Sequence, residues 1–354
     1  MSDNLIKHAI IGAGFGANVH LPVFMSSPKV RVVSLSDSGS GAAENIVPKG
    51  VNAYSDWKRM LDLEQPDSLS VVAPPNVQNE IVTEALARGI NVLCEKPFGI
   101  SLEQALAMES TRIKAEVIGA VGFQYRYEPG IKKMKALLDN GEIGSLNRLD
   151  ISWLTSGRAD PKRAWSWQHD SAQGGGVLNA FVTHVFDLLF WLSNQSASAV
   201  SGSSRILVDS RMDSDGNLRK VTAEDSVDAI VEMGSNLIAN LSVTNCQQNG
   251  TGMRIIAYGD HGWIEFRHVW PFGAADASLI VHSGTDATTI SLTPERNSVV
   301  TDTRMAPMAS LIADYCTAIN DNSNPIDMPS FAEAIQVHRA IKVLRESLLT
   351  PIGN

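Results

Sequence analysis

The sequence predicts an α/β protein of two parts: a doubly wound parallel sheet, then an α+β domain with a large, mostly antiparallel open sheet. Two observations predict the first part. A strand runs into a glycine-rich turn at residues 12–16, and short apolar strands then alternate with helices up to residue 122. A third observation predicts the second part: from residue 146 onward strands joined by short turns dominate, and hairpin connections imply antiparallel pairing.

Size and composition describe a globular chain that can bury two substantial cores. It has 354 residues, of which 44% are hydrophobic and 19% charged, and a net charge of −9. This acidic balance argues against a nucleic-acid partner. We expect no membrane span, because no apolar run approaches about 18 residues, and the N-terminus shows no signal peptide. Three isolated cysteines (Cys94, Cys246 and Cys316) fit a reducing cytoplasm.

The first strand begins at His8 and ends in the glycine turn. Gly12 permits the tight turn, and Gly14 lets the backbone approach a pyrophosphate at the N-terminus of the next helix. The third glycine of the usual G-x-G-x-x-G pattern falls at Ala17, an accepted substitute, and Gly16 is extra. The alternative is a glycine turn that binds no nucleotide.

A carboxylate follows the second predicted strand, Val30–Ser36. Asp37 can accept both ribose hydroxyls of a dinucleotide and would repel a 2′-phosphate. The next residues, Ser38-Gly-Ser, offer no cation for such a phosphate. We therefore expect NAD as the cofactor rather than NADP.

The alternation of helices and strands continues to residue 122. Pro74-Pro75-Asn76 closes the third strand, Gly89 is suited to end the following helix, and Ser101 is suited to cap the next one. The predicted elements are a helix from 55 to 61, a strand at 68–73, a helix at 77–88, a strand from 91, a helix at 101–115 and a strand at 117–121.

The strand that begins at Asn91 ends in Glu95-Lys96-Pro97. Pro97 cannot donate a ladder hydrogen bond and disfavours a helical Lys96, so the strand must stop there. Ligands of open α/β sheets bind beyond the carboxyl ends of the strands, where a fixed lysine can donate a proton or stabilise a charge. The alternative is that Glu95 and Lys96 are ordinary surface charges.

The second part carries eight main predicted strands and a closing amphipathic helix, 330–349. We place the domains at residues 1–122 and 123–354, and leave open whether the last helix packs back on the first domain. Asp213–Asn217 with Glu224 mimics part of a calcium loop but is interpreted as a hairpin turn, and no metal site is expected. The strands are 146–155, 198–207, 226–233, 236–245, 253–259, 262–268, 278–283 and 287–292.

A glycine-led helix, Gly174–Leu192, is the most informative stretch of the second part. Its apolar residues recur at helical spacing, and Ala180, His184 and Asp187 lie together on the flank of that stripe. His184 could exchange a proton near neutral pH, or it could be a core histidine bonded to Asp187. The glycines allow close approach by another backbone or by a ligand.

These motifs together resemble the Gfo/Idh/MocA oxidoreductases, the family of glucose-fructose oxidoreductase and inositol dehydrogenase. The resemblance covers nearly the whole chain and implies a Rossmann domain, with Lys96 as the active-site lysine and His184 as the family histidine. Two positions depart from the family pattern: Ala180 stands where an Asp is frequent, and Asn79 where a His is frequent. The matching segments are Gly12–Gly14, Pro75–Asn76, Glu95–Pro97, Gly122–Arg126, Gly174–Gly176 with His184 and Asp187, and the closing helix.

The function expected from this resemblance is NAD(H)-dependent hydride transfer. The substrate would be a secondary alcohol or ketone of a sugar, cyclitol or sugar derivative, including nucleotide-linked ones. Lys96 would stabilise the developing alkoxide and His184 would exchange the hydroxyl proton. Two alternatives are a non-catalytic NAD-binding regulator and a glycosidase that oxidises its substrate transiently.

The candidate binding residues follow from the motifs and the resemblance. Trp165 and Trp167 could stack on a sugar or cover the nicotinamide, or could pack beneath a loop. Substrate contacts are expected from Lys96, Arg126, Trp165, Asn179 and His184. Cofactor contacts are expected from Gly12, Gly14, Phe15, Gly16, Ala17, Asp37, Pro74, Pro75, Asn76, Glu95, Lys96, Pro97, Gln124 and Trp167.

The resemblance also implies that the antiparallel sheet carries oligomer contacts. Residues 236–243 alternate apolar and polar side chains only loosely, which indicates that both faces of this strand are covered. We therefore expect a homodimer or homotetramer built through that sheet.

Overall fold

A computed structural model describes residues 5–37, 39–234, 236–269, 277–284, 286–292 and 302–348. The chain forms two compact units, and each is described by itself. Unit 1 comprises residues 1–127 and 300–335, and unit 2 comprises residues 128–299 and 336–354. The expectations that involve Ser38, Ser235 and Leu349 lie outside the described residues.

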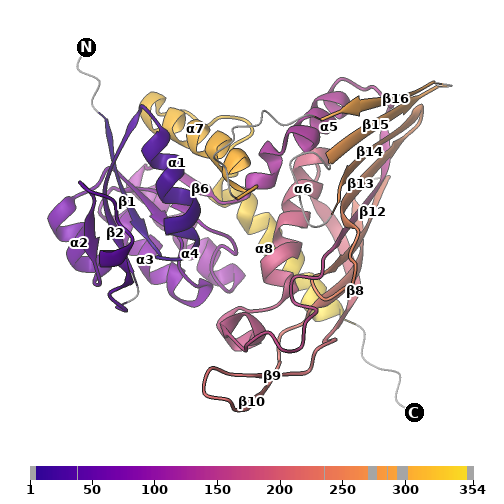
Figure 1. Ribbon diagram of the computed structural model, residues 1–354. Coiled ribbons are helices and arrows are strands. Elements are labelled where there is room, and N and C mark those ends of the chain that lie inside the picture. The colour runs from indigo at the N-terminus through magenta and orange to yellow at the C-terminus, as the bar shows by residue number, and fades with distance from the viewer. Residues whose placement is uncertain are drawn as a thin grey trace. The chain divides into compact units, whose positions relative to one another are not determined.

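Unit 1 is built on a six-stranded sheet whose neighbouring strands are all parallel (Figure 1). The predicted doubly wound sheet is therefore confirmed. The strand order reverses between β1 and β4, which places the crevice of such folds at the carboxyl ends of these two strands. In spatial order the strands are β3 (Asn52–Tyr54), β2 (Val30–Ser36), β1 (Ile6–Ile11), β4 (Ser68–Val71), β5 (Asn91–Cys94) and β6 (Gly119–Val121).

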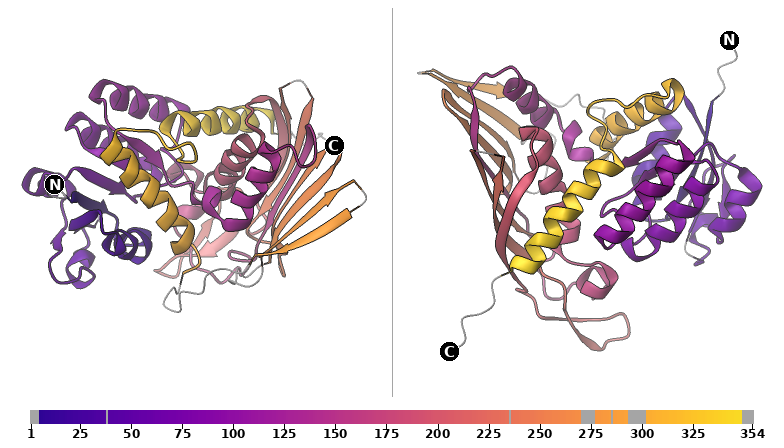
Figure 2. Two further views of the ribbon diagram at one scale, coloured as in Figure 1. Left: turned by 90° about the horizontal axis from the view of Figure 1, so that it is seen from above. Right: turned by 180° about the vertical axis from the view of Figure 1, so that it is seen from behind.

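Helices cover both faces of the unit 1 sheet (Figure 2). Ser101 caps α4 as predicted, since its Oγ accepts a hydrogen bond from the Gln104 N–H at 3.3 Å. Helix α7 was not among the predicted elements, yet its Leu311 and Tyr315 lie in the same apolar core as Ile10 and Phe24. The helices are α1 (Leu21–Ser26), α2 (Trp57–Glu64), α3 (Pro75–Ala87), α4 (Leu102–Ala115) and α7 (Met305–Asp321).

Unit 2 is built on an eight-stranded sheet in which every pair is antiparallel except β7 with β12. The eight predicted strands are confirmed, with ends that differ by one or two residues. In spatial order they are β16 (Asp286–Ser291), β15 (Ala277–Ser283), β14 (Gly262–His268), β13 (Gly252–Gly259), β7 (Leu146–Leu154), β12 (Leu237–Thr244), β11 (Ser226–Met233) and β8 (Ala197–Arg205).

A separate two-stranded hairpin, β9 (Ser210–Met212) and β10 (Leu218–Lys220), stands apart from this sheet. Its turn is the segment that mimics a calcium loop. The Asp213 Oδ1 accepts hydrogen bonds from the Asp215 N–H at 3.0 Å and the Asn217 N–H at 2.8 Å. The carboxylate therefore closes the turn, as predicted.

Three helices complete unit 2: α5 (Pro129–Asp139), α6 (Thr183–Ser193) and the main part of α8 (Phe331–Ser347). Figures 1 and 2 show α5 and α6 on one face of the large sheet. Burial along β12 alternates from residue 237 to 243, with Leu237, Ala239 and Leu241 buried and Ile238 exposed. The apolar–polar alternation of its sequence is loose because the apolar Ile238 lies on the exposed side, and the covering of both faces stays a prediction.

The helical run Ser171–Ser193 is long and apolar enough to cross a membrane by length and composition, with a mean hydropathy of 1.4. However, 83% of the window that passes this test is buried inside the structure. A membrane span would instead present its apolar side chains to lipid. This run is therefore a core helix of unit 2.

We predict that Gly130→Ala destabilises unit 2. Alanine favours a helix over glycine by about 1 kcal/mol. However, a Cβ at Gly130 would lie 2.5 Å from the Phe266 ring, which is fully buried in β14. Overpacking of this kind costs about 1–3 kcal/mol, so the net effect is a lower Tm by several degrees. Thermal denaturation checks this against Lys133→Ala on the exposed face of α5; an unchanged Tm for Gly130→Ala contradicts it.

Candidate functional site

The residues that directly follow five neighbouring strands form one row at the carboxyl edge of the unit 1 sheet. The strand register aligns Ser36, Ile11, Val71, Cys94 and Val121 across five neighbouring strands. The next residue of each strand extends the ladder: the Gly12 N–H bonds the Ser36 carbonyl, and the Gly122 N–H bonds the Cys94 carbonyl. The row Asp37, Gly12, Val72, Glu95 and Gly122 therefore lines the edge where ligands of such sheets bind.

The glycine turn beside this row has three distinct packing roles. A Cβ at Gly12, whose φ is +130°, would overlap the Val72 carbonyl oxygen. Gly14 has no heavy atom within 4 Å of such a Cβ, so its outer side is open to a ligand. At Gly16 a Cβ would lie 3.1 Å from Ile10 and 3.3 Å from Val72. Close packing of the turn on the strands thus occurs at Gly16, and Ala17 beside it is buried in the same core.

Asp37 is buried and holds the loop that follows β2. Its Oδ1 accepts hydrogen bonds from the N–H groups of Gly39 (2.7 Å) and Ser40 (3.0 Å), and its Oδ2 from that of Ala43 (2.8 Å). These bonds, led by that from Ala43, lower the pKa of Asp37 and keep it ionised. Because Oδ1 already has two donors, the remaining acceptor capacity lies on Oδ2, and the contact of Asp37 with both ribose hydroxyls stays a prediction.

A buried chain of five hydrogen bonds ends on Glu95. Each link joins two side chains at 2.9–3.1 Å, and the chain crosses from α7 through β4 and β1 to the helical turn before α1. In order the groups are the Tyr315 hydroxyl, Ser68, His8, Ser70, His20 and the Glu95 carboxylate. All six residues are buried.

This chain is satisfied when both imidazoles are neutral and only Glu95 is charged. Each hydroxyl or ring N–H then donates toward Glu95, and no link lacks a proton or an acceptor. Burial, together with the neighbouring His20, lowers the pKa of His8 well below its usual value, which fits this assignment. Burial also raises the pKa of Tyr315 at the far end. The chain therefore orients the Glu95 carboxylate, because the Tyr315 hydroxyl at its far end does not readily release a proton.

Two further residues fix the backbone around Glu95. A Cβ at Gly122 would overlap the Glu95 carboxylate, so only glycine leaves room for it. The buried Gln78 side chain donates to the carbonyls of Ala73 and Glu95, each at 3.0 Å, and accepts from the Gly99 N–H at 2.8 Å. The role of Gln78 was not predicted from the sequence, although a polar residue on the buried side of a helix is a signal that could have revealed it.

Lys96 follows Glu95 directly and is half-buried, and its peptide bond to the buried Pro97 is cis. The start of α3 lies at the same edge, where Pro74 and Asn76 are exposed and Pro75 is buried. The predicted cofactor residues of unit 1 are thus gathered along one edge of the sheet.

The 3₁₀ turn after β6, Gln124–Tyr127, carries two predicted site residues. Gln124 is 3% exposed, and among the described residues its Oε1 has no donor partner. Arg126 is buried and pairs with Glu333 at 2.8 Å, so it has a structural role whether or not it contacts substrate. Phe15, in the glycine turn, has the Arg304 guanidinium 4.6 Å from its ring centre.

The unit 1 edge fits a nicotinamide dinucleotide. Gly14 leaves its backbone open where a pyrophosphate would lie, and the Asp37 Oδ2 has acceptor capacity for a ribose hydroxyl. The buried Gln124 Oε1 needs an N–H or O–H donor that the described chain does not supply, and a carboxamide has such a donor.

In unit 2 the glycine run before the predicted helix packs against the protein itself. A Cβ at Gly175 would lie 2.6 Å from the Gln168 carbonyl oxygen, and one at Gly176 would overlap the Glu224 carboxylate. The half-buried Glu224 accepts a hydrogen bond from the Leu178 N–H at 2.9 Å and so caps the helix N-terminus. Of the two possibilities left open by the sequence, the structure shows close approach by other parts of the chain.

His184 lies in α6, one turn beyond a π-helical segment, Leu178–Val182. The Thr183 N–H bonds the Leu178 carbonyl, a spacing of five residues, so the turn before His184 is wider than in an α-helix. His184 and Asp187 are each 2% exposed, and the Trp153 ring centre is 6.0 Å from that of His184.

Asn179 and Trp165 have protein partners. The Asn179 amide donates to the Gly174 carbonyl at 3.0 Å and accepts from Arg345 at 3.0 Å. Trp165 packs on the hairpin: the Arg219 guanidinium lies 3.9 Å from its ring centre, and its indole N–H bonds the Lys220 carbonyl. Packing is thus the better supported reading of Trp165, while Trp167, half-buried in the short helix Trp167–His169, stays a prediction.

Comparisons with known proteins match both units. A family model described as "Oxidoreductase family, NAD-binding Rossmann fold" matches residues 6–123, and one described as "GFO/IDH/MocA C-terminal domain" matches residues 131–265. An uncharacterized oxidoreductase of Synechocystis sp. is 26% identical over 335 residues, which cover 90% of this chain and 87% of that protein. Glucose-6-phosphate 3-dehydrogenase of Bacillus subtilis is 25% identical over 243 residues, or 68% of each chain.

A solved structure shows the same fold. Levoglucosan dehydrogenase in complex with NADH and levoglucosan matches 97% of each chain with a TM-score of 0.85, at 20% identity. The two family models cover the parallel sheet and most of the antiparallel sheet in turn, which agrees with the resemblance seen in the sequence motifs. The chain belongs to the Gfo/Idh/MocA oxidoreductase family, with an NAD-binding Rossmann domain followed by the C-terminal domain of that family.

Proposed function

We propose that the protein is an NAD(H)-dependent dehydrogenase or reductase acting on a secondary alcohol or ketone of a sugar, cyclitol or sugar derivative. The observation that carries the proposal is the edge of unit 1, where Lys96 directly follows a buried carboxylate bonded by His20, on the same sheet edge as a glycine turn suited to a dinucleotide. Sugar dehydrogenases among the relatives support the substrate class.

Two residues carry the proposed proton chemistry. Lys96 follows a backbone fixed by Gln78 and Glu95, so its ammonium group is positioned to stabilise an alkoxide at the substrate oxygen. His184 exchanges the hydroxyl proton from its buried place in α6. The nicotinamide, when bound, accepts or returns the hydride.

A screen of sugars, sugar phosphates and cyclitols for a change in nicotinamide absorbance tests the proposal. Net conversion of NAD to NADH, or the reverse, supports a dehydrogenase or reductase. Substrate cleavage without net conversion would favour a glycosidase, and tight NAD binding without chemistry would favour a regulator.

We predict that kcat/KM favours NAD over NADP by at least about tenfold, equivalent to about 1.4 kcal/mol. The ionised Asp37 repels a 2′-phosphate. Asp37→Asn keeps one oxygen that can accept from Gly39 and Ser40, loses the acceptor for Ala43 and removes the charge, so relative use of NADP should rise. Initial rates with both cofactors check this; equal use of NADP by the unmodified protein refutes the assignment of Asp37.

Lys96→Met should lower kcat by about 10²–10⁴-fold, as expected when a positioned proton donor or charge is lost. NAD affinity, measured by fluorescence titration, should change much less because the glycine turn is intact. Lys114→Met, on an exposed position of α4, is the matched control and should behave like the unmodified protein. Near-normal turnover of Lys96→Met would mean that Lys96 is only a charge after a strand.

His184→Ala should lower kcat by at least about a hundredfold, because the acid/base group is removed. Asp187→Asn should lose less, since an amide oxygen can still accept a hydrogen bond from a ring. His261→Ala, at an exposed turn of unit 2, serves as the control. Steady-state kinetics and the pH–rate profile provide the check; if both stay unchanged in His184→Ala, another group handles the proton.

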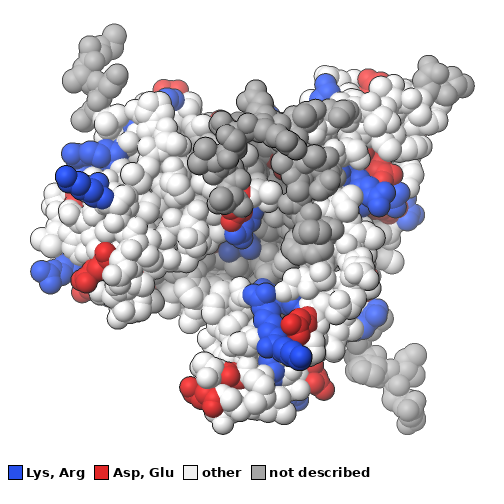
Figure 3. All heavy atoms as spheres, viewed as in Figure 1, with Lys and Arg blue, Asp and Glu red and all other residues white. Residues whose placement is uncertain are grey.

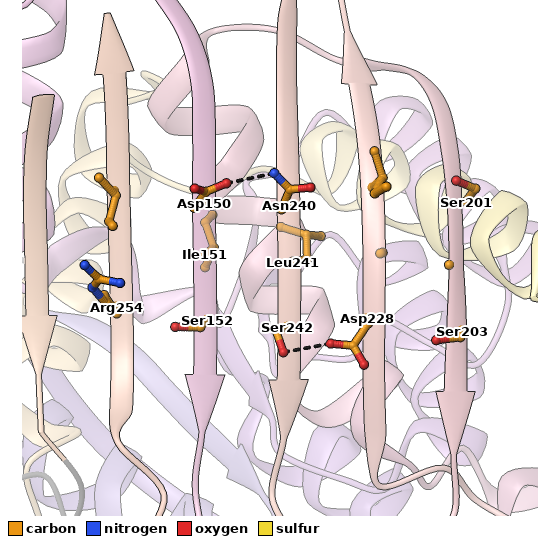
Figure 4. A pocket seen from close by; sticks show the side chains of 14 residues that line it. Asp150, Ile151, Ser152, Ser201, Ser203, Asp228, Asn240, Leu241, Ser242 and Arg254 are labelled. Atoms are coloured by element: carbon orange, nitrogen blue, oxygen red, sulfur yellow. Dashed lines mark hydrogen bonds between the residues drawn. The ribbon is translucent and has the colours of Figure 1, made fainter. Parts of the chain in front are cut away.

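We also propose that the protein is a homodimer or homotetramer assembled through the unit 2 sheet. Its outer face has a hollow of about 570 Å³ lined by β7, β8, β11, β12 and β13 (Figure 4). Asp150 with Asn240 and Ser242 with Asp228 form hydrogen bonds of 2.8 Å on this face. Ile230 and Ile238 are 52% and 47% exposed, an apolar surface that a second copy would cover.

Ile238→Asp should shift the protein toward monomers, because it puts a charge into the proposed apolar contact. Light scattering at micromolar concentration measures the change. Ile326→Asp is the control: Ile326 is 93% exposed but lies in unit 1. A monomeric unmodified protein, or an assembly that both variants leave intact, rules this interface out.

A further inference from the structure

Arg211 is a buried guanidinium without a carboxylate partner in the described part of the chain. It is 2% exposed and lies in β9. Its two terminal nitrogens donate to the carbonyls of Asp160 (2.7 Å), Arg163 (3.3 Å) and Arg158 (2.5 Å). Its Nε–H is buried and has no acceptor. Carbonyl dipoles therefore compensate only part of a charge whose burial is costly.

Arg158 adds a second charge next to Arg211. Its backbone carbonyl accepts from Arg211, and its backbone N–H donates to the Asn245 carbonyl at 2.8 Å. The side chain is half-buried, and among the described residues it has no hydrogen bond or ion pair. Burial and the neighbouring Arg163 and Arg211 lower the pKa of Arg158 to about 10, so the group lies among other cations.

Two neutral N–H donors in the same neighbourhood also have no acceptor. The His169 Nδ1 accepts a hydrogen bond from the Ser166 N–H at 3.0 Å, so in the neutral ring the proton is on the buried Nε2, which is unpartnered. Burial and the charges of Arg211 and Arg158 lower the pKa of His169 to about 4, which keeps the ring neutral. The Asn245 Nδ2, in a residue 1% exposed, is likewise buried without an acceptor.

The charge of Asp225 acts on Arg158, but the Asp225 carboxylate is also bonded by the backbone. Its carboxylate accepts hydrogen bonds from the N–H groups of Leu207 (2.8 and 3.0 Å) and Val208 (3.1 Å). The cluster of Arg158, Arg211, His169 and Asn245 thus has several donors, two full positive charges and too few acceptors. Figure 3 shows basic side chains gathered just above the β9–β10 hairpin, the part of unit 2 to which Arg211 belongs.

We propose that Arg158, Arg211, His169 and Asn245 form a binding site for an oxyanion, a phosphate or carboxylate group carried by the substrate. The missing acceptors are oxygen atoms with negative charge, which a guanidinium and neutral N–H donors bind well. Only the assignment of this anion to the substrate rests on the proposed function. It makes the substrate an acidic sugar derivative, phosphorylated or of the uronate type.

Titration calorimetry without cofactor tests the site directly, with inorganic phosphate as the first probe. Phosphate should bind the unmodified protein, and Arg158→Gln should weaken that binding at least tenfold. Asn245→Asp keeps the side-chain size but adds a negative charge, so it should weaken binding as well. Arg254→Gln, on the outer face of the large sheet and paired with Glu265, should leave it unchanged. Circular dichroism confirms that each variant is folded.

The source of the oxyanion follows from a second set of titrations with glucose 6-phosphate, glucuronate and glucose. Tighter binding of the phosphate ester identifies a phosphorylated substrate, and tighter binding of glucuronate identifies a carboxylate. Glucose should bind at least tenfold more weakly than the better of the two. Equal affinity for all three, or phosphate binding unaffected by Arg158→Gln and Asn245→Asp, overturns the proposal. These titrations need no turnover. If the protein binds the oxyanion but has no activity, the proposed function is refuted and the proposed binding site is not.

Discussion

The burial of the Glu95 carboxylate is the constraint on which the edge of unit 1 depends. A carboxylate 5% exposed is stable only if it is hydrogen-bonded, and His20 supplies a bond at 3.1 Å. His20 is held in turn by Ser70, and the chain behind it reaches from β4 and β1 to Tyr315 of α7. A single charge thus links four elements of the Rossmann core and fixes the backbone from which Lys96 extends. The polar chain can lie inside an apolar core because each of its inner members has a partner on both sides.

Glycines create the space that this arrangement needs. Gly122 leaves room for the Glu95 carboxylate, and Gly12 for the Val72 carbonyl in the next strand. Gly14 alone in the turn has open space on its outer side, so packing and ligand approach are separated onto different glycines of one short segment. In unit 2 the same principle serves the helix of His184, where Gly176 admits the Glu224 carboxylate that caps the helix N-terminus. In both units a glycine allows a carboxylate to lie against the backbone next to a proposed catalytic residue.

Buried charged groups have different kinds of partners in the two units. Glu95 ends a hydrogen-bonded chain in which every link is made, whereas the Arg158 and Arg211 guanidinium groups have no ion pair among the described residues. The first arrangement gives a rigid site that is complete without a ligand. The second leaves a local excess of positive charge, although the whole chain has a net charge of −9. A net charge therefore says little about the charge that a bound molecule would meet.

The sequence by itself determined the fold class, the eight strands of the unit 2 sheet, five of the six strands of the unit 1 sheet and the family, because strand periodicity, turn residues and short motifs are local properties. The three-residue β3 was not predicted. Glu95-Lys96-Pro97 marked the end of a strand because proline acts on its own neighbours. Only the tertiary structure decided what depends on contacts between distant segments. Gly16 packs on Ile10 and Val72, Gln78 bonds the backbone after β5, and Glu224 caps a helix about 46 positions before it in the chain. Helix α7 was also not predicted, because its place in the core depends on packing against α1 and β1. The partners of a buried polar group are set by which elements meet in space, and no local pattern records that.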